Sequence, residues 1–529
     1  MKTLSSEIVP VLGYYQTVWG KPLQKDSQPK FKVSEALSSV ASFYERLRYT
    51  IDYKKEHLLR RNAIERILKR ATSAETLVKE LIWARYIKND FYPKSEIGNL
   101  EKIISKYLVL IKEYSIKSPI GESKVSWRDW LLGVASCEIE ERLDPQLEST
   151  DILSVAAQVW FEERFDWQES GLDKKEQENQ LAIAIHRSLL RSDEAKNAFY
   201  LLRRLYRNWA NETADTLTGK SDEIYEIFLQ IRRSLTNPLQ SRLYRFIQKE
   251  VVAFQILKTF IESNPAEAGK IIIDPNALKE EIYGICEEKY GEIGDRVNRG
   301  IIRSIIYIFI TKVLFAIAIE IPYEYYFIGR ISPFPLVSTI AVPLFFVFLV
   351  GLTIKKPGET NTQRIIDIIF DFVYKGEPKQ KVDFSLAYKK RGLRHQIFGT
   401  VYWILFFAIF TLVTYILKRA GFNFVGIGIF FIFLSLVLLF GYRVRFSASE
   451  LNVTSVKESL ASNLLTNVSL PFLDLGVWLA DKFAQLNFFI VFFDFLIEAP
   501  FKNIIGIIDE WTTYLREKKE EAIEIPVER

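Results

Sequence analysis

The chain has very few of the residues that carry metal and thiol chemistry. Its 529 residues include two cysteines, three histidines and one methionine. Cys137 and Cys286 are far apart, and neither has a second cysteine at CxxC spacing. This excludes a disulfide scaffold and a cysteine zinc site, and it is typical of a reducing compartment. We therefore expect both thiols to be buried and inert.

Motifs for catalysis and cofactor binding are also missing. His57, His186 and His395 lie in separate regions without HExxH spacing. The acidic clusters at 138–141 and 162–163 lack the histidine three residues on that a di-iron helix requires. No phosphate-binding glycine loop and no GxSxG nucleophile motif occurs. The sequence predicts no metal site and no cofactor, and it favours a protein that is not an enzyme.

Charge of one sign is not in large excess. There are 70 Lys and Arg against 65 Asp and Glu, a net charge of +5. This small excess does not indicate specific nucleic-acid binding. The first 22 residues lack an apolar run of signal-peptide length. We therefore expect that no cleaved signal exports the first 300 residues.

Hydrophobic and charged residues are distributed unevenly along the chain. Residues 1–300 are rich in Lys, Arg, Glu and Asp, whereas 301–445 are dominated by Ile, Leu, Val and Phe. Apolar residues recur at helical spacing throughout the first part, without sustained strand-like alternation. The sequence predicts an all-α protein with a large soluble helical domain followed by a transmembrane region. The expected divisions are 1–120, 121–300, 301–445 and 446–529.

The first of these divisions contains a basic amphipathic helix, expected within 34–70. From Ser42 to Arg70 there are nine Lys or Arg and four Asp or Glu. Such a helix can lie on acidic lipid or nucleic acid. The favoured alternative is a solvated face with Glu–Arg pairs, because the acidic residues are interspersed rather than excluded.

Four apolar runs are long enough to cross a bilayer as helices. Each has about 20 residues, which covers roughly 30 Å of hydrocarbon. The last three contain no charged residue, which is typical of membrane spans rather than buried globular helices. The predicted spans are 301–321, 334–354, 397–417 and 422–442.

The connections between the spans predict an orientation. Residues 355–396 contain ten Lys or Arg, whereas the two short turns on the opposite side contain three. Positively charged loops remain in the cytoplasm. We therefore expect a multi-pass protein of the plasma or inner membrane, with both termini in the cytoplasm.

Two further segments are predicted to lie at the membrane interface. Arg364–Tyr374 combines a polar stripe with an apolar face, the pattern of a helix lying flat on the inner leaflet. The C-terminal part, 446–529, is expected to form interfacial amphipathic helices and a charged tail. Within it, 484–501 is nearly all apolar but contains Asp494 and Glu498. A fifth span, a re-entrant helix and a surface helix all remain open for that segment.

Lys312 is the strongest candidate for a functional residue. It lies near the middle of the first span, where a charge costs at least ~2.5 kcal/mol, and Glu320 lies near the outer end. Asp494 or Glu498 could pair with Lys312 if the C-terminal segment enters the bundle. A structural ion pair, or a lysine that extends towards the interface, is the favoured alternative. Pro343 could kink the second span.

These features support a hypothesis about the type of protein, but they do not identify the biological process that it serves. The leading interpretation is a non-enzymatic scaffold or adaptor, which is anchored in the bilayer and presents its cytoplasmic helical domain to protein partners. The alternative is a transporter or channel subunit with a regulatory soluble domain. Four spans with one internal lysine make a poor pore alone, so this alternative requires a homo-oligomer. A membrane enzyme without a recognisable motif is the third interpretation.

Overall fold

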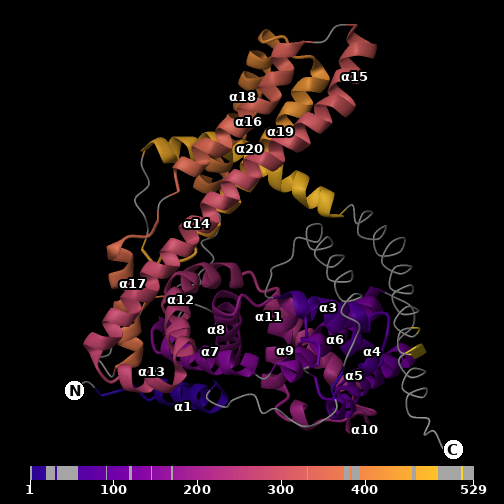
Figure 1. Cartoon of the computed structure of the whole chain (residues 1–529), viewed down its shortest axis with the longest axis vertical. Helices are drawn as coiled ribbons and strands as arrows, with labels where there is room; N and C mark the ends of the chain where they lie inside the picture. The colour runs from indigo at the N-terminus through magenta and orange to yellow at the C-terminus, as the bar shows by residue number, and fades with distance from the viewer. Residues whose placement is uncertain are drawn as a thin grey trace, which may run out of the picture. The chain divides into compact units, whose positions relative to one another are not determined.

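The computed structural model describes most of the chain. The described residues are 3–19, 30–31, 58–90, 92–117, 122–144, 146–167, 171–329, 332–354, 356–374, 382–383, 393–454, 460–485, 511 and 514–515. Helices make up almost all of their regular structure, which confirms the all-α prediction (Figure 1). A pair of two-residue parallel strands, β1 (Phe165–Asp166) and β2 (Val382–Asp383), is the exception.

The chain divides into two compact units, and each combines segments that are distant in sequence. Unit 1 comprises Met1–Ile8, Arg164–Gly171 and Lys249–Leu486, and unit 2 comprises Val9–Glu163, Leu172–Gln248 and Asn487–Arg529. The boundaries of these units differ from the four divisions that the sequence predicts, and those divisions stay a prediction. Residues 249–300 belong to the same unit as the apolar helices.

Unit 2 is a helical domain with α6 at its centre, since α3, α5 and α9 all pack against that helix. Nearly every residue from Leu131 to Glu140 is buried. Asp173 and Asp193 cap α8 and α9 by accepting hydrogen bonds from backbone N–H groups of the first turn. The elements of this unit are α1 (Ile8–Trp19), α3 (Leu59–Leu68), α4 (Ala74–Trp83), η2 (Lys94–Glu96), α5 (Ile97–Lys117), α6 (Glu122–Leu143), α7 (Gln146–Glu162), α8 (Lys174–Leu189), α9 (Glu194–Leu205), η3 (Trp209–Asn211), α10 (Ala214–Leu217), α11 (Ser221–Leu235) and the first part of α12 (Gln240–Ser263).

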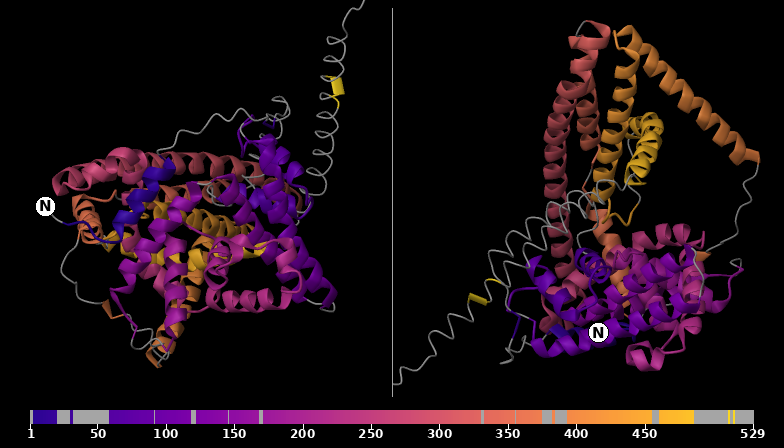
Figure 2. Two further views of the ribbon diagram at one scale, coloured as in Figure 1. Left: turned by 90° about the horizontal axis from the view of Figure 1, so that it is seen from below. Right: turned by 90° about the vertical axis from the view of Figure 1, so that its right-hand side faces the viewer.

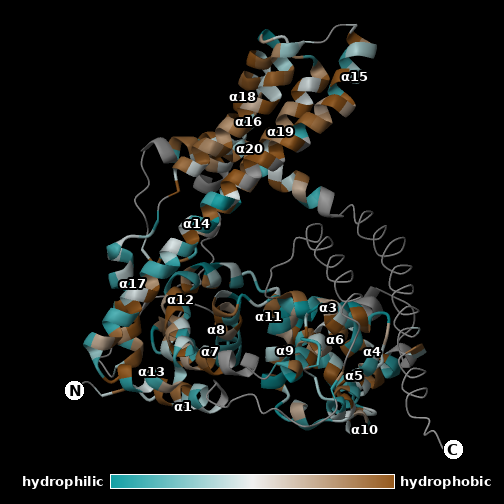
Figure 3. Cartoon of the chain, viewed as in Figure 1, coloured by the Kyte–Doolittle hydropathy of each residue, from teal (hydrophilic) through white to brown (hydrophobic). Residues whose placement is uncertain are grey.

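Unit 1 is built around α14, a helix of 41 residues from Pro275 to Phe315. Asp274 caps its start and Pro275 occupies the first turn, where a missing backbone N–H has no cost. The helix changes from polar residues near its start to apolar residues near its end (Figure 3). The other helices of this unit are the end of α12, α13 (Pro265–Ile271), η4 (Ala316–Glu320), α15 (Ile321–Tyr323), η5 (Glu324–Ile328), α16 (Pro333–Leu352), α17 (Glu359–Val373), α18 (Leu393–Arg419), α19 (Phe424–Ala448) and α20 (Leu460–Gln485).

Three helices of unit 1 are long and apolar enough to cross a membrane, which indicates a membrane protein. They are Pro333–Leu352 in α16, Ile397–Arg419 in α18 and Phe424–Phe446 in α19, and they coincide with the last three predicted spans. The first predicted span, 301–321, is not among the helices that meet these criteria. It forms the end of α14 together with η4, it contains Lys312 and Glu320, and it becomes π-helical from Ala316.

Helix α20 packs mainly against α19 and makes only a few contacts with α18. Most of α18 is exposed, and it diverges from α19 (Figure 2, right). On one side of α20, the Asp474 carboxylate accepts a hydrogen bond from the Tyr402 hydroxyl of α18. On the other side, Thr466 contacts Tyr442 and Arg445 of α19. Residues 486–510, which include the predicted 484–501 segment except its first two positions, lie outside the described residues.

The apolar face of α17 is covered by protein and not by lipid, which corrects the prediction for 364–374. Ile365, Ile366, Ile369 and Phe372 are at most 2% exposed. The Phe372 ring makes an edge contact with Phe254 of α12, and the polar stripe forms ion pairs such as Arg164–Asp371. An amphipathic pattern shows that one face is apolar, but it does not distinguish a lipid surface from a protein core.

Candidate functional site

The candidate site is a buried ion pair at the end of α14. Lys312 is 1% exposed, and its ammonium group bonds Oε1 of Glu320, which is 6% exposed. The Lys312 Nζ atom also lies 4.2 Å from the ring centre of Phe433 on α19 and 5.4 Å from that of Phe315. The lysine charge is therefore balanced by one carboxylate and two aromatic faces.

The π-helical segment η4 explains how two residues eight positions apart can pair. On a regular α-helix, such residues are offset by about 80° around the axis, since each residue turns by about 100°. From Ala316 to Glu320 the backbone is π-helical, so each turn contains more residues and each residue turns less. The offset becomes smaller, and Glu320 comes onto the same face as Lys312.

A second carboxylate, Glu324, lies one turn beyond the ion pair. Its Oε2 accepts a hydrogen bond from the backbone N–H of Ser332 at 2.8 Å, and its Oε1 accepts one from Nδ2 of Asn423 at 3.3 Å. Asn423 in turn caps the start of α19, because its Oδ1 accepts the Gly426 N–H at 2.6 Å. Glu324 therefore joins η5, the start of α16 and the start of α19.

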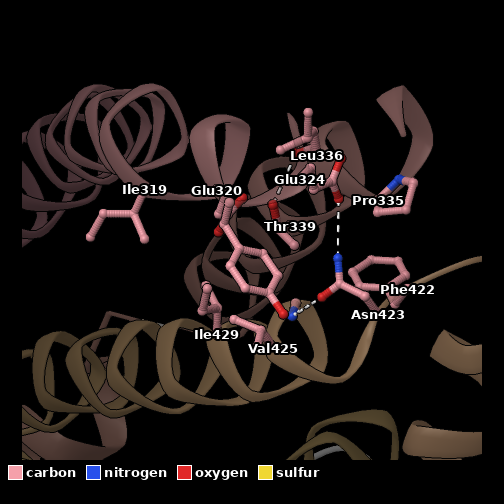
Figure 4. A pocket seen from close by; sticks show the side chains of 12 residues that line it. Ile319, Glu320, Glu324, Pro335, Leu336, Thr339, Phe422, Asn423, Val425 and Ile429 are labelled. Carbon is pink, nitrogen blue, oxygen red and sulfur yellow. Dashed lines mark hydrogen bonds between the residues drawn. The ribbon is translucent and has the colours of Figure 1, made fainter. Parts of the chain in front are cut away.

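These polar groups border a partly open pocket of about 60 Å³. Figure 4 shows the carboxylates of Glu320 and Glu324 on one side with Thr339 between them, and Asn423 on another side. Apolar side chains from α16 and α19, such as Leu336 and Ile429, complete the lining. The lining is mainly apolar with a few oxygen atoms, and the space is large enough for one or two water molecules.

The structure places the predicted site residues as follows. Lys312 and Glu320 form an ion pair with each other. Pro343 is buried within α16. Asp494 and Glu498 lie outside the described residues. Sequence reasoning missed Glu324, although its position four residues after Glu320 gave a signal that could have been used.

Asn361 of α17 forms a second buried polar cluster, where α14 meets the segment that follows α19. Its Nδ2 donates to the Tyr290 hydroxyl at 2.9 Å and to the Leu451 carbonyl at 2.8 Å. Its Oδ1 accepts the backbone N–H groups of Val453 at 2.8 Å and Thr454 at 3.1 Å. Burial raises the pKa of Tyr290 above its ordinary value. One amide thus fixes three segments of unit 1 to one another.

The acidic cluster of α6 in unit 2 is engaged in ion pairs. Lys106 binds Glu138 at 2.6 Å, Lys196 binds Glu140 at 3.1 Å, and Arg203 binds Glu141 at 3.0 Å. These pairs balance carboxylates on a helix that is surrounded by other helices. Across the described ranges, no three His, Cys, Asp or Glu side chains are grouped in a way that could hold a metal ion.

His186 and the two cysteines are buried in their units. His186 lies 3.0 Å from the Ser154 hydroxyl and packs against the Tyr200 ring, and burial lowers its pKa to about 3. Burial raises the pKa of the Cys137 thiol well above its usual range, and it raises that of Cys286 to about 11. Both thiols are free and buried, in the positions expected of packing residues.

Comparison with protein families, with curated proteins and with solved structures gave no match.

Proposed function

We propose that the chain is a multi-pass membrane scaffold, which anchors a helical domain at the cytoplasmic face and presents it to protein partners. The observation that carries this proposal is the construction of unit 1. A single helix, α14, runs from the polar part of the unit into the apolar bundle, and Asn361 fixes α17 and residues 451–454 to it.

In this proposal the end of α14, together with α16, α18 and α19, crosses the bilayer. Lys312 lies nine residues beyond Arg303, a rise of about 13 Å, and so lies near the middle of a hydrocarbon layer roughly 30 Å thick. The ten basic residues of 355–396 hold that connection, and with it the soluble helices, in the cytoplasm. Recruitment would then depend on location, since the spans hold unit 2 near the membrane.

Proximity labelling tests the scaffold proposal directly. A biotin ligase is fused before Met1 of the full chain, and the control is the same ligase on an unrelated multi-pass protein whose N-terminus is cytoplasmic. We expect a reproducible set of soluble cytoplasmic proteins that the control does not label. Identical sets from both fusions would contradict recruitment, and a reporter at Arg529 that is active only outside the cytoplasm would contradict the topology.

The ion pair and the pocket favour a second candidate, a transporter or channel subunit that acts as an oligomer. Charges within a membrane usually face a protein interior or a water-filled path. Purified protein in liposomes should then conduct an ion or solute at a rate that depends on Lys312. A Lys312→Leu variant with unchanged flux, or no flux from the wild-type protein, would argue against this candidate.

A further inference from the structure

The exposed surface of α14 changes character along the length of the helix. In its polar part, Lys289 and Glu292 form an ion pair at 3.0 Å. Arg296 and Arg299 follow in the next turns, and both side chains are exposed. Beyond them, the exposed side chains that the structure describes on this helix are apolar (Figure 3). Paired charges, two arginines and an apolar surface therefore succeed one another on a single helix.

The two arginines have no counterion in the part of the chain that the structure describes. Glu292 has the i, i+4 spacing that favours a pair with Arg296, but it bonds Lys289 instead. Asp295 has the same spacing to Arg299 and is exposed, yet no ion pair joins these two described side chains. Residues three apart are neighbours on a helix surface. The two guanidinium groups therefore present adjacent positive charges to their surroundings.

The arginines continue into an apolar line on the same face of α14. Each residue of an α-helix turns by about 100°, so Ile306 and Ile310 lie within about 20° of Arg299 around the axis. Ile302, Ile306 and Ile310 are each at least half exposed. The line from Ile302 to Ile310 rises by about 12 Å, which is close to half of a hydrocarbon layer roughly 30 Å thick. A ligand that fits this surface has an anionic head and an apolar chain.

The position of the arginines along α14 agrees with a lipid headgroup. In the proposed function, on which this inference rests, Lys312 lies near the middle of the bilayer. Arg299 precedes Lys312 by a rise of about 20 Å, and a bilayer with its headgroups is about 40–45 Å thick. Arg299 then lies in the headgroup layer of the cytoplasmic leaflet.

The segment after α16 brings a further basic group to this level of α14. Lys356 lies across Gly294, where an added Cβ atom would be 2.7 Å from the Lys356 Nζ atom. Lys356 is exposed, and within the described ranges it has no ion-pair partner. Lys355 and Arg303, whose side chains are outside the described residues, are basic in the sequence as well. Basic residues concentrated at one level beside membrane helices are typical of contact with anionic lipid.

We propose that Arg296 and Arg299 bind the phosphate of an anionic phospholipid, and that one acyl chain of this lipid lies along Ile302, Ile306 and Ile310. Two adjacent guanidinium groups can donate several charge-assisted hydrogen bonds to one phosphate. A headgroup with a net negative charge binds better than a zwitterionic one, because the ammonium group of a choline repels the arginines. The bound lipid holds α14 at a fixed depth, whichever partners unit 2 recruits.

The test uses the full chain purified in a neutral detergent. The protein is titrated with dioleoylphosphatidylglycerol and, separately, with dioleoylphosphatidylcholine, and bound lipids are counted by native mass spectrometry. We expect the anionic lipid to half-saturate the protein at a concentration about tenfold lower or less. Equal binding of the two lipids would overturn the proposal. So would displacement of the anionic lipid by an equal concentration of inorganic phosphate, which would indicate a site for free anions.

Two double variants locate the site. Arg296→Gln/Arg299→Gln should raise the half-saturating concentration of phosphatidylglycerol about thirtyfold, since each basic residue near a headgroup contributes about fivefold. Arg232→Gln/Arg233→Gln removes two exposed charges from α11 of unit 2 and should leave lipid binding unchanged. All four positions are exposed, so both variants should fold. Wild-type binding of phosphatidylglycerol by the α14 variant would show that the lipid binds elsewhere and that the proposal is wrong.

Alkaline extraction of membranes separates this inference from the proposed function. Release of the chain as a soluble protein would contradict the membrane placement of α14, and with it the lipid site. A chain that stays in the membrane but binds both lipids equally would contradict the lipid site alone.

Discussion

Gly476 of α20 lies directly against the backbone carbonyl of Ser435 on α19. A Cβ atom at position 476 would be 2.6 Å from that oxygen and 3.1 Å from the Leu439 Cβ. Because a backbone carbonyl cannot rotate away as a side chain can, the two helices reach this separation only with glycine at the crossing point. The close packing of α20 against α19 therefore depends on the absence of a Cβ atom at position 476.

Gly476→Ala should push α20 away from α19. We expect a loss of about 1–3 kcal/mol, typical of overpacking in a filled interface. The measurement is the melting temperature of the full chain in nanodiscs, together with protease access to α20. Gly428→Ala on α19 is the matched control, since a Cβ there meets nothing within 4 Å. Equal stability of the two variants would show that the crossing is looser than described.

Asn361→Leu should loosen the segment that follows α19. The substitution removes the acceptor for the Val453 and Thr454 N–H groups and the donor to Leu451. Each group that stays buried without a partner costs about 1–3 kcal/mol. Faster hydrogen exchange at Val453 and Thr454 is the expected result. Gln363→Leu, at an exposed position of the same helix, should leave this exchange rate unchanged.

Lys312→Met should destabilise the bundle more than removal of the whole ion pair does. Breaking one partner of a buried pair typically costs about 3–5 kcal/mol, because the other charge stays buried. We expect the double variant Lys312→Met/Glu320→Gln to recover part of that loss. Thermal unfolding in nanodiscs measures the loss of stability in each variant. Lys418→Met, at an exposed position, is the control. A double variant that is less stable than Lys312→Met would contradict the pairing.

Acid should destabilise unit 2 through His186. Its folded pKa of about 3 lies below the unfolded value of about 6.5. The unfolded chain therefore takes up the proton first, and stability is lost as the pH falls from about 6.5 towards 3, at about 1.4 kcal/mol per pH unit. His186→Gln should remove this part of the pH dependence, while other acid effects remain.

Alkylation of Cys137 gives the measurement for this prediction, because its buried thiol reacts only when unit 2 opens. Cys286 in unit 1 is the internal reference, and its reaction rate should not depend on residue 186. If wild type and His186→Gln show the same change in Cys137 labelling from neutral to acidic pH, the histidine does not titrate as described.

The sequence predicts a structural element correctly where a single physical requirement determines its residues. Three apolar helices coincide with charge-free runs, because a segment dissolved in lipid must be both long and uncharged. The all-α class followed from helical periodicity in the same way. Lys312 was recognised as a candidate because a single charge in an apolar run is conspicuous.

What the sequence could not predict depends on local geometry or on partners distant in the chain. The Lys312–Glu320 pairing requires a π-helical turn, and regular helical spacing places those residues on different faces. The apolar stripe of α17 suits lipid and protein equally, and its partners in α12 are more than a hundred residues away. The sequence gives no indication of the role of Asn361, because a lone asparagine does not reveal the five groups with which it forms hydrogen bonds.

The unbroken length of α14 has a mechanical consequence. Forty-one helical residues extend for about 60 Å, and no proline interrupts them after Pro275. A stiff rod of that length converts a small change of tilt at one end into a large movement at the other. A change of about 10° would move the far end sideways by about 10 Å. Bilayer thickness, which sets the tilt of membrane helices, could then alter the position of Pro275.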